Sequence, residues 1–305
     1  MSEYVDKNTL FLEPRTKQYG SHMVITNVQK PPKTKYINVD TRFRDEYSTT
    51  QQSNYNITLP DRMQAVYSIS ARSIELPITF YNISDNLRNN RLKIISGSNS
   101  EEIVLSDGQY TASSLQTALN SKFSGSTYGT SLTITLASAS RTTIVSSSGS
   151  VTLNFTVDSS VCGEVSDKYN FKMSLGWLLG FRTTTSVITT STTTTPALLD
   201  LSGPRYLYLA IDEFGKGNQH SFQCPIPSAQ VNKNVLARIT LDPANNPYGS
   251  ILPANNYNGL LLSDMRCYTG KIDIQKLNVQ LLNEVGTPMV LNGGDFSFCL
   301  ELSTE

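Results

Sequence analysis

The segment YINVDTRFRDEYS, residues 36–48, carries five charged side chains, although only 16% of the chain is charged. Mixed acids and arginines at this spacing are compatible with a metal site, a nucleic-acid contact or a structural corner. A metal site is disfavoured because two guanidinium groups among the acids repel a cation. An arginine bonded to a nearby aspartate would instead rigidify a corner through charge-assisted hydrogen bonds. We therefore predict a structural corner, with a subunit contact as the alternative, formed by Asp40, Arg42, Arg44 and Asp45. Strand alternation predicts both arginines on one face.

General acid–base chemistry has one candidate set. His220 follows Asp212 and Glu213 in the stretch DEFGKGNQHSF, and the other histidine is His22. Asp212 ends an apolar run and precedes a glycine-rich turn, where an acid usually caps the turn. GKGNQH lacks the third glycine and the following helix that a phosphate site needs. We therefore expect no enzymatic activity, no catalytic residues and no cofactor.

Composition excludes several other classes of site. The four cysteines have no C-x-x-C spacing, which disfavours a zinc module. The formal net charge is zero, whereas a nucleic-acid-binding protein normally has a basic excess, so no direct nucleic-acid contact is expected. No apolar run approaches the ~20 residues that span a bilayer, and no secretory signal is visible at Met1. We expect reduced thiols at Cys162, Cys224, Cys267 and Cys299.

The first 35 residues are predicted to form an extended N-terminal arm. Pro31 and Pro32 lie among three lysines in the sequence NVQKPPKTKY, which is typical of an extended and mildly basic segment. Such an arm is either a disordered tail or a segment that lies along a partner. The candidate partner contacts in it are Lys30, Lys33 and Lys35.

Residues 36–305 read as one all-β domain, because short period-2 patterns dominate them. The pattern changes phase near Arg72–Ser73 and again between Ile274 and Leu277, which predicts a bulge at each place. Tyr206 and Tyr208 alternate with Leu207, Leu209 and Ile211 in a strand that is apolar on both sides. Such a strand lies between two layers of one core or is covered by a partner, so both tyrosines are candidate partner contacts.

Four segments depart from the strand pattern. Residues 111–123 space apolar side chains at helical intervals, which predicts one short amphipathic helix with Thr111 or Ser113 as its N-cap. LGWLLGF, residues 175–181, is an apolar plug compatible with a single helical turn. The threonine run is predicted to be a mobile surface loop, and a long irregular connection is expected after residue 241. These loop insertions cover about 183–198 and 242–270.

Six stretches occur together in a familiar order, and they touch most of the chain from residue 36 onward. They are INVDTRFRD (37–45), SIELPITFYNIS (73–84), DGQYTASSLQTALN (107–120), LGWLLGF (175–181), LARITL (236–241) and LNGGDFSFCLEL (291–302). The set resembles a family of minor capsid proteins of nucleocytoplasmic large DNA viruses. The arm, the threonine run and much of 242–270 lie outside the resemblance.

The resemblance implies a jelly-roll-like β-sandwich that joins major capsid capsomers to each other and to other minor capsid proteins. It implies a place in the virion, on the inner surface of the shell, after assembly in the host cytoplasm. Homo-oligomerisation is a further option for the partner. Two alternatives stay open: a pentameric vertex (penton) protein, and a glycan- or host-surface-binding β-module that presents Trp177 to solvent.

Overall fold

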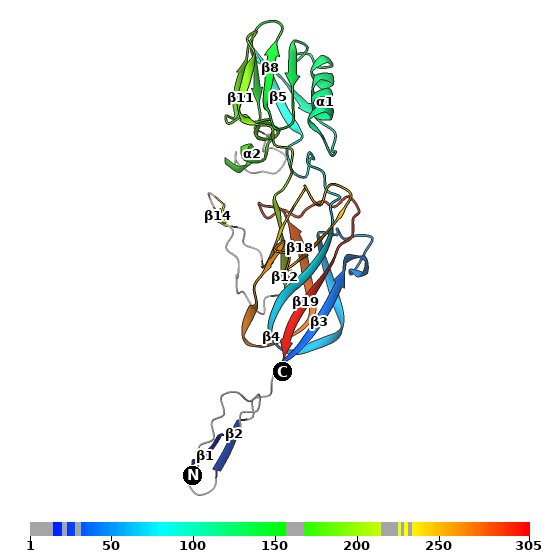
Figure 1. The fold of residues 1–305 in the computed structure, drawn as a ribbon, viewed down its shortest axis with the longest axis vertical. Coiled ribbons are helices and arrows are strands. Elements are labelled where there is room, and N and C mark those ends of the chain that lie inside the picture. The colour runs from blue at the N-terminus through cyan, green and yellow to red at the C-terminus, as the bar shows by residue number, and fades with distance from the viewer. Residues whose placement is uncertain are drawn as a thin grey trace.

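The fold is taken from a computed structural model, which describes residues 15–19, 23–27, 32–156, 168–214, 225–226, 229–230 and 234–305. Antiparallel strands dominate it, as predicted, and form a β-sandwich of jelly-roll-like type. The buried side chains gather in two main clusters, one in the sandwich and one in a second body built from residues 83–201. The sequence predicted a single sandwich domain from 36 to 305. The structure differs because the inserted segment buries its own apolar residues. Figure 1 shows the two bodies one above the other.

The sandwich is one curled sheet in the order β17-β15-β12-β18-β4-β19-β3, with β16 paired to β4. The strands are β3 (Lys33–Asp40), β4 (Asn54–Pro77), β12 (Tyr206–Asp212), β15 (Val235–Thr240), β16 (Ile251–Asn255), β17 (Leu261–Ser263), β18 (Arg266–Leu282) and β19 (Ser297–Thr304). Strand β4 has 24 residues and belongs to both layers. Its first part pairs with β18, and its last part pairs with β19 and β16.

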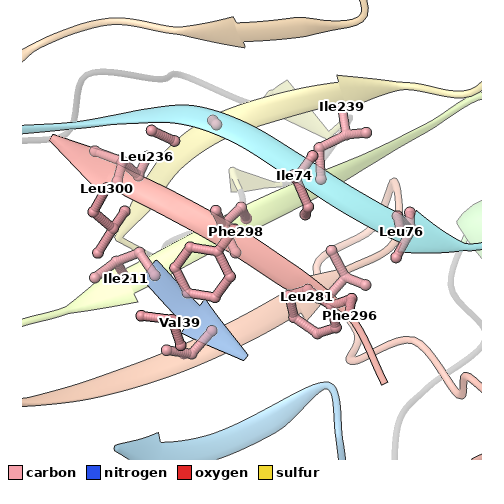
Figure 2. Packing of buried hydrophobic residues seen from close by; sticks show 14 of the residues in the cluster. Val39, Ile74, Leu76, Ile211, Leu236, Ile239, Leu281, Phe296, Phe298 and Leu300 are labelled. Carbon is pink, nitrogen blue, oxygen red and sulfur yellow. The ribbon is translucent and has the colours of Figure 1, made fainter. Parts of the chain in front are cut away.

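Alternating apolar residues of both layers fill the sandwich. Strand β19 shows strict alternation, with Phe298, Leu300 and Leu302 fully buried. Figure 2 shows side chains from β3, β4 and β19 packed together with those from β12, β15 and β18. This period-2 burial is what a sheet with one face on the core requires.

Both predicted changes of strand phase are confirmed. Cys299 pairs with Ser73 and Leu300 pairs with Ala71, so Arg72 is the extra residue of a bulge in β4. The second irregularity falls between Ile274 and Lys276 of β18, although the extra residues lie on the β4 side of the ladder. A bulge lets both flanking runs keep their apolar side chains in the core.

Within its described residues, the second body contains two small sheets and three helices. One sheet has the order β10-β9-β5-β6 and the other has the order β11-β8-β7. The elements are β5 (Arg91–Ser96), β6 (Asn99–Val104), α1 (Ala112–Ser124), β7 (Leu132–Thr135), β8 (Arg141–Ser146), β9 (Val151–Asn154), α2 (Lys168–Met173), α3 (Leu175–Leu178), β10 (Thr185–Ile188) and β11 (Thr193–Leu198).

Helix α1 begins where the sequence placed it. Thr111 is the N-cap: its hydroxyl accepts a hydrogen bond from the Ser114 amide, and the Ser114 side chain accepts one from the Thr111 amide. Leu115, Leu119 and Phe123 lie on the buried face of the helix. The expected single turn at LGWLLGF is α3, and Leu175 of this helix lies in the same core as Leu179 and Phe181, which follow it.

The threonine run is not the mobile loop that the sequence predicted. Strand β10 pairs with β9 and strand β11 pairs with β8. Thr195 is buried, and its hydroxyl accepts a hydrogen bond from the Thr142 amide while donating to the Ala197 carbonyl. β-branched threonine fits a pleated sheet, so a threonine run can form strands although it lacks apolar alternation.

The expected arm and the long connection also contain strands. In the predicted arm, strands β1 (Arg15–Tyr19) and β2 (Met23–Asn27) form an antiparallel pair. Strand β3 already begins at Lys33. The predicted arm, residues 1–35, therefore includes residues of the sandwich, because Lys33 and Lys35 belong to β3. The stretch 242–270 contains β16, β17 and the start of β18. Before this stretch, β13 (Pro225–Ile226) pairs with β14 (Ala229–Gln230). Among the described residues, no helix is long and apolar enough to cross a membrane.

Candidate interaction surface

The charged segment closes a corner at the end of β3. Asp40 is the N-cap of a 3-10 turn, Thr41–Phe43, and its Oδ1 accepts a hydrogen bond from the Arg42 amide at 2.9 Å. The Arg42 guanidinium also binds this carboxylate, with Nη2 donating to Oδ2 at 2.6 Å. This side-chain hydrogen bond lowers the pKa of Asp40 and raises the pKa of Arg42. An arginine bonded to Asp40 is the kind of contact that the sequence analysis predicted.

The two arginines do not share a face, contrary to the prediction. The 3-10 turn breaks the strand alternation, so the Arg42 side chain is 65% exposed while that of Arg44 is 3% exposed. Asp45 is bound by Thr58 rather than by an arginine: the Thr58 hydroxyl donates to its Oδ2 at 2.7 Å. Asp45 thereby ties the end of the corner to β4.

Arg44 is the centre of the corner. Its Nη1 donates to the Thr41 carbonyl at 2.8 Å and to Asp295 Oδ1 at 3.0 Å, and its Nη2 donates to the Tyr47 carbonyl at 3.0 Å. The Thr41 hydroxyl also binds Asp295, at 2.8 Å. Asp295 lies immediately before β19, about 250 residues away in sequence, so sequence reasoning missed it. The only local signal was an acid next to the final strand pattern.

The lysines predicted as partner contacts have different positions. Lys33 pairs with Thr304 and Lys35 pairs with Leu302 along β3, and both lysines are exposed. Lys30 lies outside the described residues. Strand β3 is the last strand of the sheet on this side, so its second edge carries no strand among the described residues. The two lysines therefore lie on an open sheet edge.

Tyr206 and Tyr208 lie on the face of β12 opposite the main core. They form a small cluster with Ala210, Val235 and Leu282, with the two tyrosine rings 5.3 Å apart. Tyr208 is 6% exposed and Tyr206 is partly buried under the Arg238 guanidinium, 4.3 Å from its ring. Of the two alternatives, core or partner contact, the structure favours the core, because within the chain these rings are largely covered. Only Tyr206 retains surface that a partner could contact.

The outer face beside β3 carries large exposed side chains. Tyr36 on β3 is 65% exposed, Ile251 on β16 is 64% exposed and Tyr257 after β16 is 93% exposed. Between them Arg72, the bulge residue of β4, pairs with Glu301 of β19. The hydrogen bond from Arg72 lowers the pKa of Glu301. We call this face, with β3, β19, β4 and β16, the outer face.

The acid–base candidates are not assembled as a reactive pair. Asp212 Oδ1 accepts a hydrogen bond from the Phe214 amide, which is the turn-capping role expected for it. Glu213 is buried and accepts from Arg266 Nη1 at 2.8 Å and from the Tyr268 hydroxyl at 2.6 Å. Burial raises the pKa of Tyr268, with Glu213 adding to the effect. His22 and His220 lie outside the described residues.

Arg266 was also missed by sequence reasoning. Its side chain is fully buried, and besides Glu213 it binds the carbonyl oxygens of Ile211 and Asn234. The partners lie at the end of β12 and directly before β15, and Arg266 itself is the first residue of β18, so the arginine joins three strands. Within the described residues no group of acids, histidines or cysteines is arranged to hold a metal ion.

Trp177 does not present an open ring. It is partly buried, its ring meets Phe171 edge-on at 5.7 Å, and Arg182 lies over it at 3.8 Å. A solvent-exposed Trp177 would have favoured the glycan-binding alternative. The observation that would have favoured that alternative is therefore not found here.

No family model matches the chain, and no curated protein is similar to it in sequence. Two solved structures of viral proteins are similar in fold. The crystal structure of the mavirus penton protein shares 9% identity, covering 90% of this chain and 100% of that chain with a TM-score of 0.45. The cryo-EM structure of the Sputnik virophage contains a chain with 10% identity, covering 90% of this chain and 98% of that chain with a TM-score of 0.39.

Proposed function

We propose that this chain is a structural protein of a virion, a minor capsid component that links major capsid capsomers. The ordered set of six stretches that resembles the minor capsid family supports this role. The observation that carries the proposal is the open edge of β3 beside an outer face with three large exposed side chains, Tyr36, Ile251 and Tyr257. Exposed aromatic and aliphatic groups on a rigid sheet are typical of protein–protein contacts.

In this proposal the protein acts by binding neighbouring capsid proteins and not by catalysis. An interface of roughly 800 Å² per partner suffices for specific association, and repetition in a lattice increases avidity. The near-zero net charge avoids repulsion between copies. The corner would fix the conformation of the edge through Asp40, Arg42, Arg44 and Asp45. Neighbouring proteins would contact Lys33, Lys35 and Tyr206. Placement on the inner surface of the shell and assembly in the host cytoplasm belong to the same proposal.

A reconstruction of purified particles tests the proposal. Density for this chain between or beneath the capsomers is the expected result, with the outer face against a neighbour. Density at the five-fold vertices would establish the penton alternative instead. Particles that lack the chain would refute both roles. A matched pair of variants, Tyr257→Ser and Val187→Ser on the second body, would show whether loss of incorporation is specific to the outer face.

A further inference from the structure

Strand β3 presents a long regular edge. All eight of its residues pair with β19 without a register shift. The strand at the opposite end of the sheet, β17, has three residues. Short or irregular edges resist further pairing, whereas a long regular edge is a template for another strand. Of these two ends of the sheet, the edge of β3 is therefore the one suited to extension by another strand.

The hydrogen-bond pattern shows which backbone groups point to this open edge. Along an antiparallel pair, alternate residues direct both backbone groups toward the neighbour. Thr41 donates its amide to the Phe296 carbonyl at 3.0 Å, so Val39, Ile37 and Lys35 also face β19.

A second bond gives the same assignment independently. Ala71 of β4 is opposite Leu300 but donates its amide to Ser263 Oγ at 2.9 Å, on the side away from β19. Leu300 must therefore face β3, where its partner is Ile37. It follows that Thr34, Tyr36 and Asn38 direct their amides and carbonyls outward, and within the described part of the chain no strand receives them.

We propose that β3 pairs with β3 of a second copy of this chain, antiparallel and centred on Tyr36. Tyr36 would face Tyr36 of the other copy, and Thr34 would face Asn38 in both directions. Each of these pairs exchanges two backbone hydrogen bonds. The contact is isologous, with the same surface used by both copies. It does not depend on the proposed virion role.

The side chains fit this pairing. The exposed Tyr36 rings would meet across the symmetry axis on the outer face, where aromatic cross-strand pairs are favourable. Lys35 would lie opposite Ile37 and Lys33 opposite Val39, so no lysine directly faces a lysine. The ladder would end at Pro32, which has no amide donor to offer at the position facing Asp40. Centred on Tyr36, the three outward residues Thr34, Tyr36 and Asn38 pair only with one another in the second copy, and this self-complementarity favours the chain itself as the partner.

Sedimentation of the full-length protein over a wide concentration range tests the inference. The native chain should show a reversible monomer–dimer equilibrium. Tyr36→Pro removes an outward donor from each copy while leaving the bonds to β19 in place, and proline is tolerated on edge strands. With about 1 kcal/mol per hydrogen bond, the dimer dissociation constant should rise about thirtyfold.

The matched controls are Tyr36→Ser and Tyr257→Ser. Tyr36→Ser should weaken the dimer less than the proline variant, and Tyr257→Ser, which removes an exposed tyrosine away from the edge, should leave it unchanged. Thermal melting checks that each variant is folded, and Thr34→Pro replaces Tyr36→Pro if the latter fails to fold. A monomeric native protein, or a dimer unaffected by these proline substitutions, would overturn the inference.

Discussion

Arg42 and Arg44 are two positions apart and have opposite environments. Arg42 is solvent-exposed and bonded to one neighbouring acid, whereas Arg44 is buried and binds groups from three places in the chain. An exposed ion pair contributes little to stability because water and salt screen it. Breaking a buried pair is costly because it leaves one charge without a partner. Because the two arginines are only two positions apart, an exposed and a buried arginine–aspartate pair can be compared within one corner.

Arg44→Met should destabilise the protein by about 3 kcal/mol or more, since Asp295 and the carbonyls of Thr41 and Tyr47 lose their partner. Arg42→Met is the matched control and should change the free energy of unfolding only slightly. Urea denaturation of both variants measures the difference. Equal effects of the two substitutions would show that Arg44 does not hold the corner together.

Asp40 predicts a pH dependence. Its pKa in the folded state is lowered by the hydrogen bond from Arg42, so the carboxylate contributes stability above its unfolded pKa of about 3.9. That contribution disappears as the pH falls through the lowered, folded-state pKa. Asp40→Asn keeps the capping oxygen and removes the charge. The stability difference between native and variant should therefore be present at neutral pH and vanish in strong acid, as measured by urea denaturation at each pH. A difference that grows on acidification would contradict this assignment.

At the scale of elements, helix α1 separates two N-cap candidates that the sequence could not distinguish. The Thr111 hydroxyl accepts from the Ser114 amide, whereas Ser113 lies inside the helix and its carbonyl accepts from the Thr117 hydroxyl. Thr111→Ala should destabilise the protein by about 1 kcal/mol, and Ser113→Ala should be nearly neutral. Thermal melting of the two variants, compared with the native chain, decides between them. A larger loss of stability for Ser113→Ala than for Thr111→Ala would show that Ser113 is the N-cap.

Local patterns predicted the elements whose causes are local. The start of α1 at Thr111 or Ser113, the turn at Leu175–Leu178 and the change of phase near Arg72–Ser73 depend on residues within a few positions of each other. The threonine run was misjudged because its strands are defined by neighbours in β8 and β9. The sequence does not show such pairings directly.

The candidate surface was predicted less completely for the same reason. Asp40, Arg42 and Arg44 were identified, but the anchor of the corner, Asp295, is far away in sequence. Arg266 and Glu213 are likewise 53 positions apart in sequence and meet only in the folded chain. A buried arginine has no signature in a single sequence, because the same residue type is usually exposed.

At the scale of the molecule, the second body is an insertion between β4 and β12. Asn82, at its start, donates its side-chain amide to the Leu201 carbonyl at 2.9 Å and to the Tyr110 carbonyl at 2.9 Å. The two ends of the insertion are therefore held side by side. Of the residues in 83–201 that the structure describes, only Leu87 belongs to the buried core of the sandwich.

Joining Asn82 to Ser202 through a short glycine–serine linker should thus leave a folded sandwich. Its thermal unfolding should remain cooperative, with a loss of stability from removing Leu87 and the contacts around Asn82. Circular dichroism and calorimetry measure both properties, and the full chain is the reference. A product without a cooperative transition would show that the sandwich requires the insertion.

The pairing of β3 with β19 has a consequence for biosynthesis. The Thr41 and Asp295 side chains that meet at this seam are separated by 254 positions, so a ribosome must deliver nearly the whole described chain before β3 gains its neighbour. The inserted body, made of contiguous sequence, can fold while translation continues. Long-range strand pairing is intrinsically slow. A nascent or prematurely terminated chain would therefore expose the unclosed sandwich to chaperones and proteases, and only a finished polypeptide would escape them.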